Sequence, residues 1–595
     1  MSEILSSFDS DASRTEDALV ETADEQQRGS LNGCVLITGH ARVDAREALQ
    51  HTLAAGGHTL LDGVTDAELI LHAHEAWGEQ CLDHLQGDFS FAIADPAKRR
   101  LLCARDHFGV QPFYYARVGE RLFFGNRLEC VRQHQEVSGR LNEHALGDFL
   151  AFGFKQDHSA TAFADIHSLP PAHSLVFEGG QLRVQRYWSL PVEPVRFRRP
   201  EEYRERYLEL LQAAVADRLR TPRAAILLSG GIDSPSIAAI AKARLTPCPA
   251  AARGNPPFFK AYTVVYDRLI DHDERRWAGA VADHLGIPIE FLPADDTRLY
   301  EMWAEGDCAS NAEGSRNETT VGNPGRLPCG RPCTTPEPVD NPLWAIPARL
   351  FRRIASDGYQ VVLSGEAGDA VSLPERALPG LLATGHFAAL ARDICGYWRG
   401  HGQRPPFWVR AWWNTSEKGG SRRRRLLDVP DWLHPRVAAD VVERARDRPP
   451  APGGGWAHRE LQSPMWPWCA LTQSREWTGV PLDVRYPFLD LRLVSFMLGV
   501  PSVPWMHDKE LMRLAMRGRL PGEVLRRPKV PLREDPVEAL VRRHGPPALP
   551  AASNPVWAFV DRARFEERWR AGEGLRQLLR VVSLARWLDG QGARA

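Results

Sequence analysis

Residues 224–241, AAILLSGGIDSPSIAAIA, constrain the fold of this chain more than any other stretch. An apolar run ends in Ser-Gly-Gly, turns through Ile-Asp-Ser and becomes apolar again, which is the order strand, loop and helix. Pro235 suits the first turn of that helix. Further apolar strands (AYTVVYD, IEFLP and YQVVLSG) alternate with helical patterns, one of them over about 273–285. This alternation predicts an α/β domain built on a doubly wound parallel sheet.

The loop at residues 229–234 has the composition of a phosphate site. Ligands of an open parallel sheet bind beyond the carboxyl ends of its strands, where this loop lies. Gly230 and Gly231 let backbone N–H groups approach an anion, while Ser229 and Ser234 add hydroxyl donors. The following helix points its positive end at the same place. We therefore expect the loop to bind a phosphate; the alternative is a plain glycine-rich turn.

Two acidic positions predict a cation beside this phosphate. Asp233 lies inside the loop, and no G-x4-G-K-[ST] loop with its phosphate-binding lysine occurs in the chain. A carboxylate next to phosphates implies a divalent cation between them. The strand VVLSG runs into a second acidic turn, where we expect Asp369 to be the second Mg²⁺ ligand and Glu366 to orient or deprotonate a nucleophile. The alternative is a solvated acidic turn.

These motifs resemble those of the asparagine synthetase family. SGGIDS resembles its pyrophosphate loop and SGEAGDA its second signature, and the likeness continues through residues 484–498 (VRYPFLDLRLVSFML) and 509–529 (KELMRLAMRGRLPGEVLRRPK). In the first half, ITGHARVDAREAL, the stretch from TDAELIL to FSFAIAD, ARDHFGVQPFYYA and SLPPAHSL resemble the family's glutaminase domain. Several motifs in family order make a chance similarity an unsatisfactory explanation.

The resemblance implies a two-domain organisation. Residues 31–195 would form a degenerate Ntn-hydrolase-like, glutaminase-type αββα domain. Residues 196–595 would form a PP-loop ATP-pyrophosphatase-type ligase domain, with a parallel sheet, a helical carboxyl-terminal region and a loop insertion at about 304–334. The polar, acidic residues 1–30 are expected to be a disordered tail.

The resemblance also assigns roles to residues. ATP and Mg²⁺ are the implied cofactors, with Asp233 and Asp369 as metal ligands and Glu366, Asp369 and Lys529 as catalytic residues. Lys529 matches a lysine that the family uses in catalysis, and Lys509 is a further candidate for phosphate binding or for a solvated helix face. The residues expected to bind nucleotide are Leu227, Ser229, Gly230, Gly231, Ile232, Asp233, Ser234, Val264, Ser364 and Gly365.

The chain departs from the family at the glutaminase nucleophile. The family uses a cysteine exposed as the first residue after Met removal, whereas this chain has Ser2 and no cysteine before Cys34. Ser2 is also expected to begin a polar tail rather than a strand. We therefore predict no glutaminase activity, so that the nitrogen nucleophile is free ammonia or an amine already on the substrate. A second departure is Ala370, which replaces an acid that the family carries after Asp369.

Branches of the family that lack this cysteine are intramolecular ligases. The segments TTPEPVDNPLWA (334–345), VPDWL (429–433) and SPMW with RYPFLDLRL resemble the lasso peptide cyclases, which join a peptide's N-terminal amine to an Asp or Glu side chain. That resemblance implies a precursor peptide as substrate and a leader peptidase or leader-binding protein as partner. The alternatives are a β-lactam-synthetase-like ligase, an ammonia-dependent asparagine synthetase and a degenerate scaffold that only binds a peptide.

Charge and hydropathy exclude other classes. The formal net charge is −1, so no global electrostatic attraction to nucleic acid or to membranes is expected. No apolar run reaches the length of a spanning helix, and the first residues lack the pattern of a signal peptide. A cytoplasmic enzyme is the resulting expectation.

Overall fold

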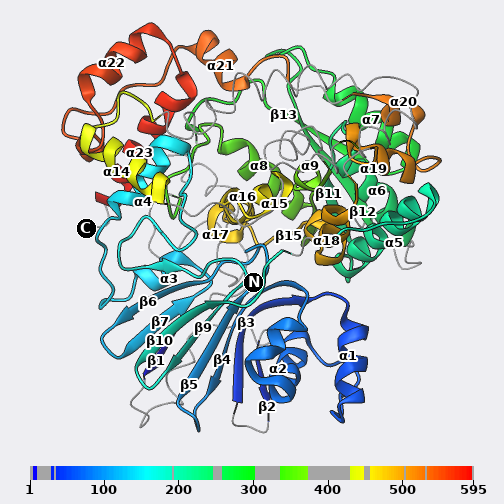
Figure 1. Cartoon of the computed structure of the whole chain (residues 1–595). Helices are drawn as coiled ribbons and strands as arrows, with labels where there is room; N and C mark the ends of the chain where they lie inside the picture. Colours follow the sequence, from blue (N-terminus) through cyan, green and yellow to red (C-terminus); the bar gives the residue numbers. More distant parts are fainter. Residues whose placement is uncertain are drawn as a thin grey trace, which may run out of the picture. The chain divides into compact units, whose positions relative to one another are not determined.

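A computed structural model describes residues 5–9, 28–31, 35–190, 193–245, 257–301, 335–372, 391, 429–447, 456–501, 504–528 and 532–592. The chain forms two compact units (Figure 1), described here one at a time. The first comprises residues 1–148, 154–191 and 462–472, and the second comprises residues 149–153, 192–461 and 473–595. Within the described residues, no helix has the length and apolar character that crossing a membrane requires.

The first unit contains two antiparallel sheets. One has the strand order β10-β9-β5-β4-β3-β2 and the other the order β1-β7-β6-β8. The strands are β1 (Leu5–Asp9), β2 (Arg28–Leu31), β3 (Val35–Val43), β4 (Gly87–Asp95), β5 (Arg100–Arg105), β6 (Tyr114–Val118), β7 (Arg121–Gly125), β8 (His167–Ser168), β9 (His173–Glu178) and β10 (Gln181–Arg186).

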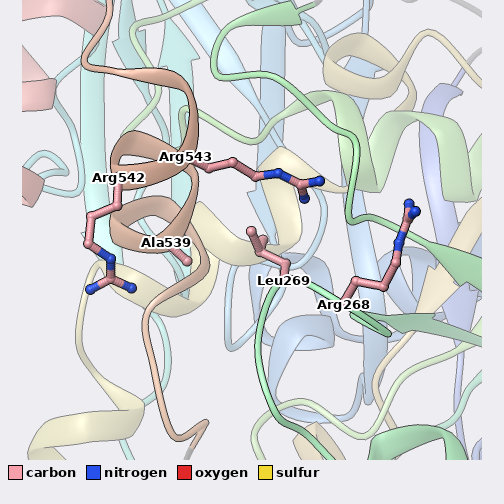
Figure 2. Close-up of a pocket in the computed structure, with 5 residues that line it drawn as sticks. All are labelled: Arg268, Leu269, Ala539, Arg542 and Arg543. Atoms are coloured by element: carbon pink, nitrogen blue, oxygen red, sulfur yellow. The ribbon is translucent and has the colours of Figure 1, made fainter.

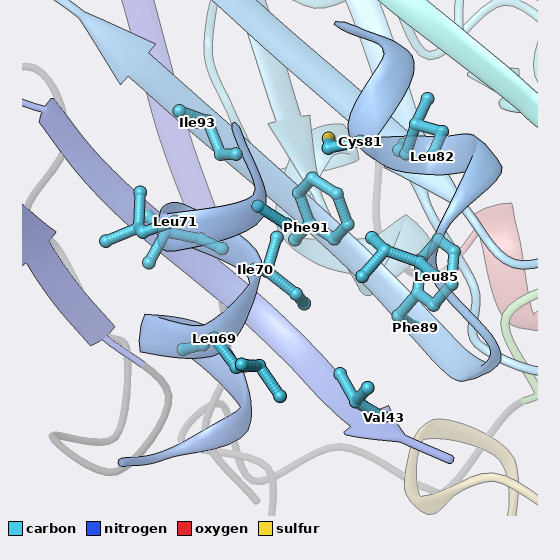
Figure 3. Packing of buried hydrophobic residues seen from close by; sticks show 14 of the residues in the cluster. Val43, Leu69, Ile70, Leu71, Cys81, Leu82, Leu85, Phe89, Phe91 and Ile93 are labelled. Atoms are coloured by element: carbon cyan, nitrogen blue, oxygen red, sulfur yellow. The ribbon is translucent and has the colours of Figure 1, made fainter. Parts of the chain in front are cut away.

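Alternating side chains of the larger sheet build two cores. Phe89, Phe91 and Ile93 of β4 pack against α1 (Arg46–Ala55) and α2 (Asp66–Trp77), as Figure 3 shows for α2. Ala92 and Ala94 point the other way and pack with the smaller sheet. The layers are therefore helices, sheet and sheet, with α3 (Leu128–Arg132) packed against β6 and β7 of the smaller sheet. This arrangement agrees with a glutaminase-type domain. The unit also contains η2 (Gly78–Asp83), most of α4 (Glu143–Phe152) and α16 (Met465–Thr472).

The structure corrects the expectation of a wholly disordered tail. Leu5–Asp9 forms β1, which pairs with β7 from Leu5 opposite Gly125 to Asp9 opposite Arg121. Arg28–Leu31 forms β2 and pairs with β3. The average composition of residues 1–30 does not indicate these short strands, because each depends on hydrogen bonds to its partner strand rather than on its own apolar content. The sequence predicts no strand near Ser2, whereas the structure has a strand that begins three residues later, at Leu5.

The second unit is built on a five-stranded sheet in which every neighbouring pair is parallel. The strand order is β13-β12-β11-β14-β15, so the chain reverses direction across the sheet between β11 and β14. This confirms the predicted parallel α/β sheet and creates a topological switch point. The strands are β11 (Ala224–Leu227), β12 (Phe259–Val265), β13 (Ile289–Pro293), β14 (Val361–Leu363) and β15 (Asp483–Arg485).

Helices accompany this sheet and form the carboxyl-terminal part of the unit (Figure 1). The described helices are α5 (Pro200–Arg218), α6 (Asp233–Arg244), α7 (Glu274–Leu285), α8 (Ala345–Ser356), α9 (Gly368–Ser372), α14 (Pro435–Asp447), α15 (Trp456–Leu461), α17 (Arg475–Thr478), η4 (Pro487–Leu489), α18 (Leu491–Gly499), η5 (His507–Lys509), α19 (Glu510–Ala515), α20 (Gly522–Arg526), α21 (Pro536–His544), η6 (Pro555–Ala558), α22 (Arg562–Ala571) and α23 (Leu575–Gly592).

Several motifs outside the nucleotide loops make packing contacts. Asp490, in RYPFLDLRL, caps α18 and pairs with the buried Arg218 of α5 at 3.1 Å. In TTPEPVDNPLWA, Asp340 accepts a hydrogen bond from Arg580 of α23 at 2.9 Å. In VPDWL, Asp431 pairs with Arg568 of α22 at 2.7 Å. These residues hold helices together, so their resemblance to the cyclase branch does not by itself identify a substrate site.

Candidate active site

The two predicted loops meet at the switch point between β11 and β14. The first follows β11 and the second follows β14, and glycines allow the two backbones to touch. A Cβ added to Gly365 would lie 2.8 Å from the Ser234 nitrogen. One added to Gly368 would lie 2.7 Å from Asp233 Cγ. Neither glycine has a positive φ, so close approach, rather than backbone conformation, explains the absence of a side chain.

Asp233 and Asp369 converge on one ammonium group. Lys509, which is 5% exposed, forms an ion pair with Asp233, and its Nζ lies 2.5 Å from Asp369 Oδ1. Lys509 immediately precedes α19 and has a left-handed backbone, with φ of 59°. Two carboxylates that can reach one cation suit the binding of a divalent ion, so the residues fit the predicted Mg²⁺ site.

The first loop is braced by its own side chains and its neighbours. The Ser229 N–H donates to Ser234 Oγ at 2.8 Å, and the Gly230 N–H donates to Glu274 Oε1 at 2.6 Å. Arg527 Nη1 donates to the Gly230 carbonyl at 2.6 Å. The expectation of bare N–H groups at Gly230 and Gly231 is therefore wrong for Gly230, since its N–H donates to Glu274 within the protein.

Glu274 and Arg527 were missed in the sequence. Glu274 is the first residue of α7, and Arg527 lies in the RRPK stretch, two residues before Lys529. The composition of the loop indicates a phosphate site, but it does not identify the residues of other elements that hydrogen-bond to the loop and fix its shape. The positive end of α6 remains directed at the loop, since Asp233 and Ser234 are its first two residues.

Glu366 is held by two neighbouring side chains. Gln473 Nε2 donates to Glu366 Oε1 at 2.7 Å, and the Tyr486 hydroxyl donates to Gln473 Oε1 at 3.0 Å. The tyrosine therefore fixes which end of the amide faces Glu366. Burial raises the pKa of Glu366, while the hydrogen bond from Gln473 lowers it. A carboxyl group whose pKa is raised by burial is a better proton acceptor than an ordinary exposed one.

The orientation of Glu366 also depends on its own turn. Glu366 Oε2 is shielded from solvent and has no hydrogen-bond partner among the described residues. The next residue, Ala367, has φ of 65°, which is unusual for a residue with a Cβ. The Glu366 N–H donates to the Oγ of buried Ser364 at 3.3 Å.

The apolar residues that are expected to bind the nucleotide lie at or near the strand ends that the sequence predicts for them. Leu227 ends β11 and Val264 lies one residue before the end of β12, and both are half-buried at neighbouring strand ends. Ile232 is buried at the start of α6. Gly231 is exposed, and its N–H lies 3.4 Å from Ser229 Oγ. Lys529 lies outside the described residues, so its catalytic role stays a prediction.

A separate hollow lies beside the residues that follow β12. Arg268 and Leu269 line it from that segment, and Ala539, Arg542 and Arg543 line it from α21 (Figure 2). Arg543 extends toward the Leu269 segment, whereas Arg542 extends from the other side of the helix (Figure 2). None of the predicted site residues that the structure describes lines this hollow.

Three of the four described cysteines of the first unit are poor nucleophiles, whereas Cys469 of α16 is only partly buried. Cys81, Cys103 and Cys130 are all buried. Burial raises the pKa of the Cys81 thiol to about 12 and that of Cys103 well above its ordinary value. A thiol must ionise to attack glutamine, so none of these three replaces the missing amino-terminal cysteine.

Comparison with known families agrees with this geometry. Residues 206–302 and 335–589, more than half of the chain, match the family described as asparagine synthase. The chain belongs to the asparagine synthase family. Residues 32–188 match the family described as glutamine amidotransferase domain. Membership of this family indicates an ATP-dependent ligase.

Curated relatives cover different shares of the chain. Asparagine synthetase [glutamine-hydrolyzing] 3 of Bacillus subtilis is 26% identical over 82% of this chain and 73% of its own length. Asparagine synthetase [glutamine-hydrolyzing] 2 of the same organism is 22% identical over 78% of this chain and 58% of its length. Amidase chry2 of Gibberella zeae is 29% identical over 41% of this chain and 37% of its length.

Proposed function

We propose that this protein is an ATP-dependent amide ligase that closes a macrolactam in a precursor peptide. It would adenylate an Asp or Glu side chain and join it to the peptide's N-terminal amine, as lasso peptide cyclases do. The proposed ligase activity rests on one observation, the convergence of Asp233, Asp369 and Lys509 where two glycine-containing loops meet. The observations that favour an amine from the substrate are Ser2 in place of the family's cysteine and the burial of Cys81, Cys103 and Cys130 among the described residues.

The first half-reaction is assigned to the two loops. A side-chain carboxylate oxygen attacks the α-phosphorus of ATP; an acyl-adenylate forms and pyrophosphate leaves. Ser229, Gly231 and Ser234 would contact the departing pyrophosphate beside the positive end of α6. Mg²⁺, held by Asp233 and Asp369, supplies neutralising charge when bound.

Lys509 adds a positive charge that the loops lack. Its ammonium is buried and already faces both acidic residues. A cation in this position stabilises negative charge on the α-phosphate and on the oxyanion of the second half-reaction. Lys509 is therefore a second proposed catalytic lysine, in addition to Lys529. Of the two, Lys509 lies among the residues that the structure describes.

The second half-reaction is assigned to Glu366. The amine attacks the acyl carbon, its proton passes to a base, and AMP leaves with its phosphate oxygen. Glu366 is the proposed base because Gln473 occupies Oε1 and leaves Oε2 as the acceptor. The overall products are the lactam, AMP and pyrophosphate, with loss of one water from the peptide.

Ammonia-dependent asparagine synthesis is the second candidate. Asparagine synthesis is favoured by the Bacillus subtilis relative, asparagine synthetase [glutamine-hydrolyzing] 3, which matches 82% of this chain, and ammonia is proposed because Ser2 stands in place of the family's cysteine. The same adenylation site would then activate aspartate, with free ammonia as nucleophile. A β-lactam-synthetase-like reaction would differ from the cyclase only in substrate size.

Parallel reactions separate these candidates. Purified protein with Mg-ATP is given aspartate with ammonia, or peptides that start with glycine and carry an internal Asp or Glu, in the presence of the peptidase partner. We expect AMP only with peptide, together with a peptide lighter by one water. AMP with aspartate and ammonia alone would contradict the cyclase and establish the synthetase. Absence of AMP in every reaction, from protein that binds Mg-ATP, would contradict the ligase.

A further inference from the structure

A cluster of two imidazoles and a carboxylate lies on the first unit, away from the proposed chemistry. His58 follows α1, while His72 and Glu75 lie three residues apart on one face of α2. One ligand atom from each lies within 4.8 Å of the others. Among the described residues, no other group of three or more His, Cys, Asp or Glu side chains converges in this way.

From this cluster we infer a binding site for a divalent transition metal, with Zn²⁺ as the ion of choice. Two imidazoles and one carboxylate are a ligand set that Zn²⁺ accepts, leaving a fourth position open. Imidazole nitrogen also favours this class of metal over Mg²⁺, which prefers oxygen ligands. The site is therefore chemically distinct from the proposed Mg²⁺ ligands Asp233 and Asp369.

The distances between ligand atoms fit a tetrahedral ion. Metal–ligand bonds of about 2.1 Å in a tetrahedron separate ligand atoms by about 3.4 Å. Glu75 Oε2 lies 3.4 Å from His58 Nδ1 and 3.8 Å from His72 Nδ1. The two imidazole planes meet at 70°, so the rings do not stack on each other. Closing the widest separation, which is at most 4.8 Å, to the tetrahedral value requires side-chain movements of about 1 Å.

These side chains are not committed to other contacts that explain their convergence. His72 Nδ1 is shielded from solvent and has no hydrogen-bond partner in the part of the chain that the structure describes. Its distance to Glu75 is too long for a hydrogen bond. The side chains of His58 and His72 are only 22% and 20% exposed, whereas that of Glu75 is 40% exposed. An ion could thus enter from the Glu75 side.

Both elements that carry the ligands are rigidly placed. The backbone N–H of His58 donates to the Leu53 carbonyl at 3.1 Å, which ties it to the end of α1. Thr65 and Glu68 form a capping box at the start of α2. The opposite face of α2 is buried in the core shown in Figure 3. A metal would therefore link the segment after α1 to α2 with little rearrangement.

The test is a metal titration of the full chain after removal of bound metal with a chelator. Calorimetry with Zn²⁺ and the visible spectrum with Co²⁺ report stoichiometry, affinity and tetrahedral geometry. We expect one site that Glu75→Gln weakens at least tenfold and that His58→Gln with His72→Gln abolishes, while Mg²⁺ does not compete. His51→Ala, on an exposed position of α1 outside the cluster, is the control and should titrate like the parent protein.

Each outcome bears on the inference. Absence of stoichiometric Zn²⁺ binding overturns it, as does binding that survives the double variant or Glu75→Gln unchanged. Zn²⁺ bound elsewhere, for example by Cys308, Cys329 and Cys333, would survive these substitutions and count against it. Because Glu75→Gln preserves shape at an exposed position, it should fold even where the double variant does not. Mg-ATP binding should be unaffected in every variant that folds.

Discussion

The contact between the two loops makes Gly365→Ala an informative substitution. The added Cβ would lie 2.8 Å from the Ser234 nitrogen and 2.9 Å from Ser234 Cβ. Ordinary contacts begin at 3.4 Å, so the two backbones must separate by about half an ångström or more. Overpacking of this kind costs about 1–3 kcal/mol. The shift moves the second residue of α6, which is expected to face the phosphates.

The assay is calorimetric titration of the whole protein with Mg-ATP, which needs no peptide. If the overpacking energy appears in binding, the dissociation constant rises roughly 5- to 150-fold. Thermal unfolding of the same samples reports any share of the energy that appears as lost stability. Together the two losses should account for about 1–3 kcal/mol.

Gly279→Ala is the matched control. Gly279 lies inside α7, and the nearest atom to an added Cβ is Phe291 Cζ at 3.8 Å. Alanine is favoured over glycine in a helix interior by about 1 kcal/mol, so this variant should be neutral or more stable. If Gly365→Ala binds Mg-ATP and unfolds like Gly279→Ala, the loops do not form the nucleotide site as described.

Three further predictions test other parts of the molecule. Gln473→Leu removes a hydrogen bond that lowers the pKa of the Glu366 carboxyl group, so that pKa should rise further. Because the base must be deprotonated, the acidic limb of the pH profile of AMP release should move to higher pH; an unmoved limb would exclude Glu366 as the base. Arg218→Leu removes one charged hydrogen bond to buried Asp490, which keeps its pair with Arg492 at 2.7 Å, and should cost about 1.5–3 kcal/mol of stability, whereas Arg204→Leu, exposed on the same helix, should cost almost nothing in thermal unfolding. The protein should release no glutamate from glutamine in a coupled assay, and release at the level of a glutamine-hydrolysing relative would mean that another nucleophile serves the first unit.

The parallel sheet was predictable because each of its strands is short, apolar and followed by a helix. Local periodicity specifies such elements, and the loop after β11 carries its chemistry in consecutive residues. The same reasoning failed for β1, since Leu5–Asp9 is a strand only by pairing with β7, more than a hundred residues away. Strand edges of this kind leave little trace in a local window.

The site was only partly predictable. Asp233, Glu366 and Asp369 could be found because they follow strands in glycine-containing turns. The role of Lys509 was not predictable, because a single lysine before a helix is common. Only the structure shows that its ammonium lies between two carboxylates. Glu274, Arg527 and Gln473 act through hydrogen bonds to residues far away in the chain, and no spacing rule connects such positions.

The central claim is that the enzyme activates a carboxylate of its substrate as an adenylate. The most direct measurement uses a peptide whose acceptor Asp or Glu side chain carries ¹⁸O in both oxygens, incubated with the protein, Mg-ATP and the peptidase partner. Attack of the carboxylate on the α-phosphorus leaves one labelled oxygen on the phosphate, so the released AMP should gain one ¹⁸O and the lactam should retain the other. Unlabelled AMP, or label in inorganic phosphate together with ADP, would contradict the account.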